Sequence, residues 1–295
     1  VIASSGGEIP FTAVVTPLDY TSSNTINVDQ DFEVDWGDGS FSPYSAGDAI
    51  AIASNAATGI ITVQSANAPT QIKFLTDTFT TIDITESSSL TIANSMCEHL
   101  TNLTSFDMAD ASNIYGFATS WWDCTGLTSF PAIDTSSGLY FNSCWLGCTG
   151  LTSFPVIDVS SSPSLNTTWS GCSGLLAFPP IDTTGRTSVN NAWQGCSSLT
   201  SFPLLNFSSV TDFVGAWWNC TGLLSMPAID TSAGTAFGNT FSCCSSLVCL
   251  STLDTTLQVS TSGLFTGTTV LVAPDGTEQT ALLAGSNYVN GSPCP

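Results

Sequence analysis

The sequence predicts a mainly β protein, in which a small antiparallel β-sandwich-like module precedes a solenoid of about eight stacked coils. Three observations support this. Cysteines recur every 24 residues from Cys124 to Cys244, apolar residues keep fixed places relative to each of these cysteines, and the first 72 residues lack cysteine and alternate apolar with polar residues. A fixed period of this length is typical of solenoids, whose coils bury their apolar sides only against neighbouring coils.

The N-terminal module is expected over residues 1–72. The segments FTAVV, FEVDW and IITVQ alternate apolar and polar residues, as half-buried antiparallel strands do. Between them, DWGDGS predicts a tight turn at residues 35–40. Asp35 and Asp38 would stabilise this turn through their own side chains or, alternatively, bind calcium. The first explanation is simpler, because Asp-Gly pairs form turns unaided.

The repeat occupies residues 73–267, and each unit supplies several inward-facing groups. An aromatic residue lies three positions before each of these cysteines. Leu follows each cysteine after three positions, Phe, Met or Leu after six, and Ile or Leu after nine. Stacked about 4.8 Å apart, equivalent residues should form buried ladders. The ladder residues are Cys124, Cys148, Cys172, Cys196, Cys220, Cys244, Trp121, Trp145, Trp169, Trp193 and Trp217. Before them, Cys97 is expected to open a looser copy lengthened by three residues.

Proline limits the strands of each unit. Pro131, Pro155, Pro179, Pro203 and Pro227 lie between two inward positions, where a long strand would lose ladder hydrogen bonds. The strands should therefore be very short, with LTSF the best candidate. The Gly, Ser, Thr and Asn residues of the second half predict turns or 3₁₀ segments.

The pattern W-x-G-C-[TS]-[GS]-L-T-S-F-P-x-I-D-T-S resembles the BspA-like leucine-rich-repeat family, over roughly residues 73–285. It departs from that family in having Trp where Phe is usual and Pro in the strand region. TTVLVAPDGTEQTALL, which opens a closing segment at 268–295, is similar to the segment that follows such repeats. WGDGS is similar to the turn of PKD-like β-sandwich modules. The resemblance implies a surface protein of a bacterium or protist, or a phage-particle component, with an adhesive or structural role.

The eleven cysteines do not predict a zinc site, because C-x₂-C spacing is absent and His99 is the only histidine. The ladder cysteines are expected to stay reduced, because parallel Cβ vectors do not converge as a disulfide requires. Outside the ladder, Cys249 and Cys294 could pair and fasten the tail to the last coils in an oxidising compartment.

An acid follows most cysteines after ten positions, and stacked carboxylates repel one another. The members are Asp107, Asp134, Asp158, Asp182, Asp230 and Asp254, with Asn206 interrupting the row. In the simpler explanation, each Asp accepts backbone N–H groups of the turn that follows. The alternative is a file of calcium ions at Asp134, Asp158 and Asp182. We prefer the first, because Asn206 can cap a turn but would weaken a metal site.

Composition excludes several functions. The formal net charge is −21, from 23 acidic and 2 basic residues, which excludes nucleic-acid binding and polybasic docking to lipid. No apolar run approaches the roughly 20 residues needed to cross a bilayer, so membrane insertion is not expected. No catalytic arrangement is recognisable, because His99 occupies a solvent-facing turn without a partner nucleophile. We therefore expect no enzyme activity and, calcium apart, no cofactor.

The predicted function is a non-enzymatic adhesion or receptor-binding protein on the surface of a virion (a phage fibre, spike or decoration protein) or of a bacterial cell. An extracellular location fits a chain with almost no Lys and a surface of hydroxyls and carboxylates. Partners would be a host-surface glycan or protein. The alternative is a self-associating structural subunit that contacts its own copies and other particle proteins.

Trp122 and Trp218 are the candidate partner-binding residues. Each follows a ladder tryptophan, at a position that most other units fill with polar residues. Both should therefore be at least partly exposed, and exposed Trp is enriched at binding hot spots and stacks on sugar rings. The alternative is that each covers a neighbouring turn or a seam with another subunit.

Overall fold

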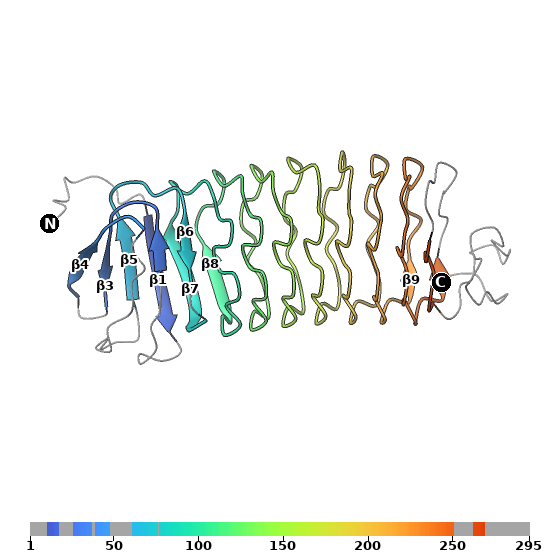
Figure 1. Cartoon of the computed structure of the whole chain (residues 1–295), viewed down its shortest axis with the longest axis horizontal. Helices are drawn as coiled ribbons and strands as arrows, with labels where there is room; N and C mark the ends of the chain where they lie inside the picture. Colours follow the sequence, from blue (N-terminus) through green and yellow to red (C-terminus); the bar gives the residue numbers. More distant parts are fainter. Residues whose placement is uncertain are drawn as a thin grey trace.

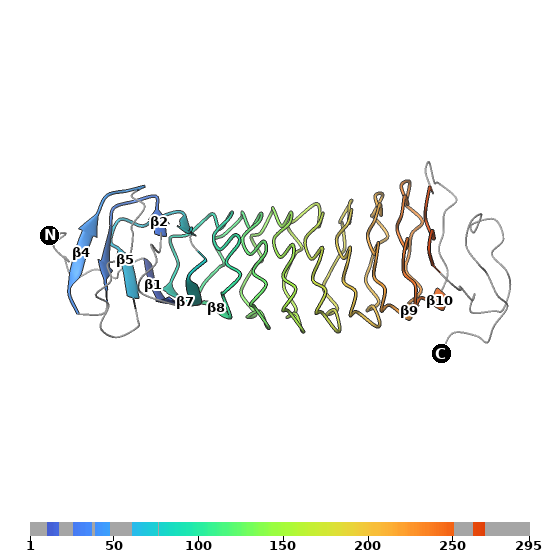
Figure 2. The same cartoon turned by 60° about the horizontal axis from the view of Figure 1, so that its bottom comes forward.

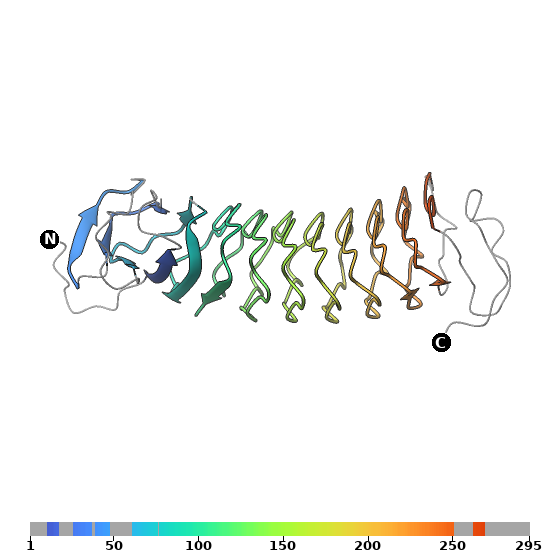
Figure 3. The ribbon, with the colours of Figure 1, turned by 90° about the horizontal axis from the view of Figure 1, so that it is seen from below.

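The computed structural model describes residues 11–17, 26–36, 39–47, 61–75, 77–250 and 262–268. These residues form an elongated molecule with a β module at one end and a row of stacked coils extending from it (Figure 1). They are mainly β and contain no α-helix. The coils follow one another in chain order along the long axis (Figure 3).

A six-stranded mixed sheet forms the first part of the molecule. Its strands are β1 (Phe11–Pro17), β3 (Phe32–Asp35), β4 (Phe41–Tyr44), β5 (Ile61–Ser65), β7 (Phe79–Glu86) and β8 (Ser105–Met108), in the order β4-β3-β5-β1-β7-β8. All neighbours are antiparallel except β7 and β8, which are parallel. The antiparallel strands expected from the alternating pattern are present, and β5 alternates buried and half-buried residues along its length. The change to parallel pairing marks the start of the stacked coils.

A second, two-stranded sheet pairs β2 (Ile26–Val28) with β6 (Ile72–Phe74), and β6 spans the boundary expected after residue 72. After β3, the Gly39 N–H donates to Asp35 Oδ1 at 2.9 Å, so the Asp35 side chain accepts a backbone hydrogen bond at the expected turn. Gly39 has a φ of 81°, which glycine adopts without steric cost. Asp38, the other acid of this expected turn, lies outside the described residues.

The coils stack in parallel with a period of 24 residues. Isolated parallel bridges join residues that far apart, from Ile92 with Gly116 to Asp212 with Ala236. Ladder backbones add regular hydrogen bonds; the Trp145 N–H donates to the Thr168 carbonyl at 2.9 Å, and Trp169 and Trp193 repeat this contact one and two coils later. Each coil therefore satisfies its neighbour's backbone groups while burying their shared apolar side.

The unit that begins near Cys97 differs from the sequence interpretation. β7 pairs with β8 at an offset of 24 residues, and the Cys97 N–H donates to the Ser120 carbonyl as ladder tryptophans do. Cys97 therefore occupies the tryptophan position, and Leu100 the cysteine position. The expected three-residue lengthening was wrong. The sequence interpretation aligned Cys97 with the ladder cysteines because both are Cys, whereas the structure aligns Cys97-x-x-Leu100-x-x-Leu103 with Trp-x-x-Cys-x-x-Leu of the later units.

Strands are few in the coils beyond β8 and shorter than LTSF. β8 is followed only by the two-residue pair β9 (Ser225–Met226) and β10 (Cys249–Leu250), near the far end of the described coils (Figure 2). In the middle coils, LTSF at residues 127–130 and 151–154 forms no strand, and the backbone hydrogen bonds between these segments are few, such as the one from the Thr152 N–H to the Thr128 carbonyl. The following proline has no N–H to continue the ladder, so side-chain packing must hold these segments.

Candidate partner-binding surface

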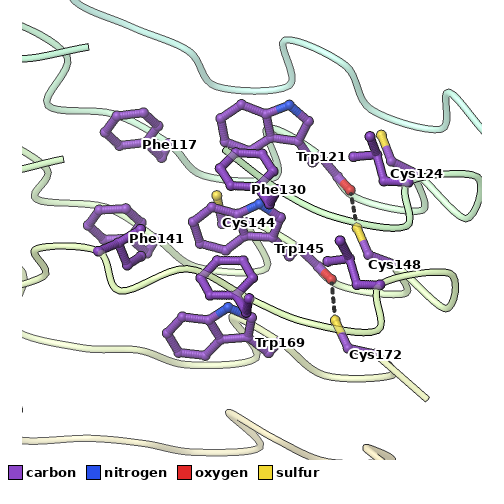
Figure 4. Close-up of a cluster of buried hydrophobic side chains, with 14 of the residues drawn as sticks. Phe117, Trp121, Cys124, Phe130, Phe141, Cys144, Trp145, Cys148, Trp169 and Cys172 are labelled. Carbon is purple, nitrogen blue, oxygen red and sulfur yellow. Dashed lines mark hydrogen bonds between the residues drawn. The ribbon is translucent and has the colours of Figure 1, made fainter. Parts of the chain in front are cut away.

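A continuous aromatic ladder supports the surface from within. Trp145 and Trp169 stack with ring centroids 5.8 Å apart and an interplanar angle of 5°, and each packs edge to face against Phe154. Figure 4 shows the same arrangement around Trp121, Phe130 and Trp145. All five ladder tryptophans are fully buried. Such close packing fixes the backbone of each coil, so residues pointing outward keep a regular spacing.

The ladder cysteines are free and buried, and their thiols contact the preceding coil. Cys148 Sγ donates to the Trp121 carbonyl at 3.0 Å and Cys172 Sγ to the Trp145 carbonyl at 3.1 Å (Figure 4). Burial raises the pKa of the Cys196 thiol to about 12. Cys144, which the sequence places outside the ladder, is also completely buried. These thiols are structural groups rather than nucleophiles.

The row of acids caps turns. Asp134 Oδ1 accepts the Ser136 N–H at 3.0 Å, and Asp158, Asp182 and Asp230 each accept the N–H two residues further on. Asn206 accepts the Ser208 N–H at 3.1 Å in the same way. Among the described residues, no group of three His, Cys, Asp or Glu residues is arranged to hold a metal ion. Calcium at Asp134, Asp158 and Asp182 stays a prediction.

The acid predicted for the first unit of this row, Asp107, was wrong. Asp110, rather than Asp107, is equivalent to Asp134, and Asp110 Oδ1 accepts the Ser112 N–H at 2.9 Å. Asp107 instead accepts the N–H of Met108. The error has the same origin as the misplaced Cys97, because both positions were counted from that cysteine.

Trp122 lies in a cluster of polar and charged side chains. Its indole packs on the imidazole of His99, with ring centroids 4.8 Å apart. A carboxylate lies beside each imidazole nitrogen: Glu98 Oε1 is 3.5 Å from Nε2, and Asp123 Oδ2 is 3.4 Å from Nδ1. Trp122 is half-buried, so part of it remains accessible beside two acids and a histidine.

Trp218 occupies the equivalent position four coils later and is 39% exposed. Between the two tryptophans the neighbouring column consists of Gly147, Gly171 and Gly195, with φ between 73° and 75°. These glycines have no side chains, whereas the column of the tryptophans itself continues with Leu146, Ser170 and Gln194 between Trp122 and Trp218. We call this set, the two tryptophans and the three glycines, the Trp–Gly strip. The left-handed backbone explains why glycine fills the column there.

Two features were missed by the sequence interpretation. Arg186 is buried, and its guanidinium donates to the carbonyls of Val159 and Ser160 in the preceding coil and of Thr184 in its own. Burial lowers the pKa of Arg186. The second feature is a set of exposed aliphatic residues that follow the ladder Leu or Pro. Comparing each column along the repeat, rather than only the constant positions, could have found it.

The expected disulfide cannot be placed, because Cys294 and the side chain of Cys249 lie outside the described residues. Within the described ranges, no helix is long and apolar enough to cross a membrane. Comparison of the chain with family models, with curated proteins and with solved structures gave no match.

Proposed function

We propose that the chain is a non-enzymatic, extracellular adhesion or receptor-binding protein on the surface of a virion or a bacterial cell. We also propose that its coils form a BspA-like leucine-rich-repeat solenoid behind a PKD-like β-sandwich module. In this function the stack of coils is a stiff spacer that presents the Trp–Gly strip to a glycan or protein on a host surface.

One observation carries this proposal: Trp218 is exposed and Trp122 is half-buried in one column, although ladder residues beside them are fully buried. An exposed indole retains apolar surface that a partner can cover. Around Trp122, Asp123 and Glu98 offer carboxylate oxygens that can accept hydrogen bonds from sugar hydroxyls or peptide N–H groups. Aromatic rings with nearby polar groups suit both glycans and proteins.

The experiment compares attachment to candidate host cells or glycan arrays for the wild-type chain and the double variant Trp122→Ser, Trp218→Ser. We expect attachment to be lost with little change in melting temperature, because both side chains are partly outside the core. Trp145→Ser is the matched control, because it removes a buried ladder residue and should lower the melting temperature. Attachment that persists in the double variant would contradict the proposal.

A second candidate function is a self-associating structural subunit, which one separate observation favours. Several aliphatic side chains are exposed on the coils, and contact with another copy would remove them from water. The net charge of −21 would keep the single chain soluble although these side chains are exposed. Light scattering after size-exclusion chromatography separates the two candidates: a monomer at all concentrations supports adhesion, and a concentration-dependent increase in mass supports self-association.

A further inference from the structure

Five of the exposed aliphatic residues lie on one side of the stack, and we call them the aliphatic face. The members are Val156, Leu176, Leu204, Leu224 and Val248, which are between 48% and 67% exposed. Three directly follow a buried ladder Leu, and the other two, Val156 and Leu204, directly follow Pro155 and Pro203 at a position four residues further along the unit. Their side chains are exposed, and the segments that carry them lie in line with β8, β9 and β10 along the stack (Figure 2).

The aliphatic face carries no charge. In six successive units the ten residues from the ladder Cys to the ladder Ile or Leu include no Asp, Glu, Lys or Arg, although the chain has a formal net charge of −21. The carboxylates come immediately afterwards, in the turn-capping row of Asp134, Asp158, Asp182 and Asp230. A band without charge, in which exposed aliphatic residues alternate with Thr and Ser, is therefore bordered on one side by a row of negative charge.

We propose that the aliphatic face binds the same face of a second copy of this chain about a two-fold axis. This inference rests on the second candidate function and names its surface. Copies with so large a negative charge repel one another in most orientations, but this contact brings no carboxylate into its centre. The period adds specificity: both copies have the same coil spacing, so side chains of one can fit between the rows of the other along the whole band.

The size of the face sets the expected strength. Six rows about 5 Å apart span about 25 Å, and seven extended residues span about 20 Å, which gives about 500 Å² for each copy. Two copies would bury about 1,000 Å², near the lower limit for a specific interface. We therefore expect reversible association with a dissociation constant in the micromolar range, rather than a permanent dimer.

The repeat itself supplies variants that should fold. Thr152 and Thr200 occupy the column of Leu176 and Leu224, and Ala132 and Ala228 occupy the column of Val156 and Leu204. The test variant therefore introduces residues that other coils already carry at the same positions. It combines Val156→Ala, Leu176→Thr, Leu204→Ala and Leu224→Thr. The control variant, Leu139→Thr with Tyr140→Ser, removes exposed apolar groups from a different part of the coil and takes its residues from Thr187 and Ser164.

The experiment is sedimentation equilibrium of the full chain from about 1 to about 300 µM, a range that brackets weak interfaces. We expect the wild type and the control variant to dimerise, and the test variant to have a dissociation constant at least about tenfold higher at an unchanged melting temperature. Raising NaCl should strengthen wild-type dimers, because salt screens the bordering Asp rows.

Each other outcome contradicts the proposal in a distinguishable way. Wild-type dimers that the test variant leaves intact would place the interface elsewhere and keep the self-association function. Dimers lost only in the control variant would assign the contact to the Leu139 and Tyr140 region. A wild-type chain that stays monomeric over the whole range and at high salt would overturn both this surface and the second candidate function.

Discussion

The Cys148 thiol lies 3.0 Å from the Trp121 carbonyl oxygen, 27 residues earlier in the chain, and donates a hydrogen bond to it. The same contact recurs between Cys196 and Trp169 at 3.3 Å. Each thiol thus satisfies a buried carbonyl of the preceding coil while filling the space beside the aromatic ladder. Ionisation would remove the donor and leave a negative charge in an apolar interior.

This relationship predicts loss of stability at alkaline pH. Burial raises the pKa of the ladder thiols, so they stabilise the fold fully below the unfolded pKa and lose that effect as pH rises toward the folded pKa, about 12 for Cys196. The unfolding free energy should therefore fall above about pH 8.5, by up to about 1.4 kcal/mol per pH unit for each buried thiol. Urea unfolding at several pH values measures this slope.

Cys196→Ser provides the matched variant, because a serine hydroxyl can donate to the Trp169 carbonyl but does not ionise in this range. Its slope should be shallower than that of the wild type by about 1.4 kcal/mol per pH unit. Equal slopes would show that this thiol does not cause the alkaline loss.

The tryptophan ladder predicts a large difference between two substitutions at one position. Trp169→Ala should destabilise the fold by about 3 to 5 kcal/mol, because it opens a cavity beside Trp145 and Trp193. Trp169→Phe should cost less than about 1.5 kcal/mol. One reason for the small cost is that Phe241 already occupies the same ladder. The other is that Phe removes the buried Trp169 indole N–H, which has no hydrogen-bond partner among the described residues. Chemical denaturation measures both, and a Phe variant as unstable as the Ala variant would reveal a partner for that N–H.

The periodic part of the fold could be predicted because each ladder position repeats one physical requirement. Trp121 to Trp217 are buried at every turn of the stack, and a constant spacing in the sequence reports a constant environment. At Cys97 the prediction was wrong, because one residue type occurs at two different positions of the coil. Apolar size and backbone pairing, rather than residue identity, set the phase there.

The outward-facing features were harder to predict, because exposed positions vary from coil to coil. Trp122 and Trp218 were found because they stand beside ladder tryptophans, whereas Leu176 and Leu204 alternate with Thr and Ala and were overlooked. The contact of Trp122 with His99 depends on one coil placing its imidazole over the next. Such contacts follow from the stacking offset, which only the pairing of coils defines.

The turn-capping acids predict a stability loss at low pH. Hydrogen bonds from Ser136 lower the pKa of Asp134, those from Thr184 lower that of Asp182, and those from Ser232 lower that of Asp230. Repulsion along the row would raise these pKa values, so the capping bonds dominate. A lowered pKa stabilises the fold above the unfolded pKa, near 3.9, and the effect is lost as pH falls through the lower folded pKa.

The variant Asp134→Asn, Asp182→Asn, Asp230→Asn keeps the acceptor oxygens, as Asn206 does naturally. Its melting temperature should fall less than that of the wild type between pH 6 and pH 3. An equal or larger fall would assign the acid sensitivity to other groups. Millimolar CaCl₂ tests the calcium prediction in the same assay: a rise in melting temperature for the wild type alone would support an ion beside these acids.

Gly171 offers a variant that separates binding from stability. It has a φ of 74°, and Asn219 adopts 62° in the same column, so Gly171→Asn should cost less than about 1 kcal/mol. The new side chain would stand next to the Gly147 backbone, in the glycine column of the Trp–Gly strip. A partner lying along the strip should therefore bind more weakly, with an almost unchanged melting temperature.

Gly185→Asn is the control, because Gly185 has a φ of 80° and open space around it but lies outside the strip. If both variants bind the partner as the wild type does, the glycines are only a backbone requirement of the coils, and contact with the partner must be confined to the tryptophans themselves.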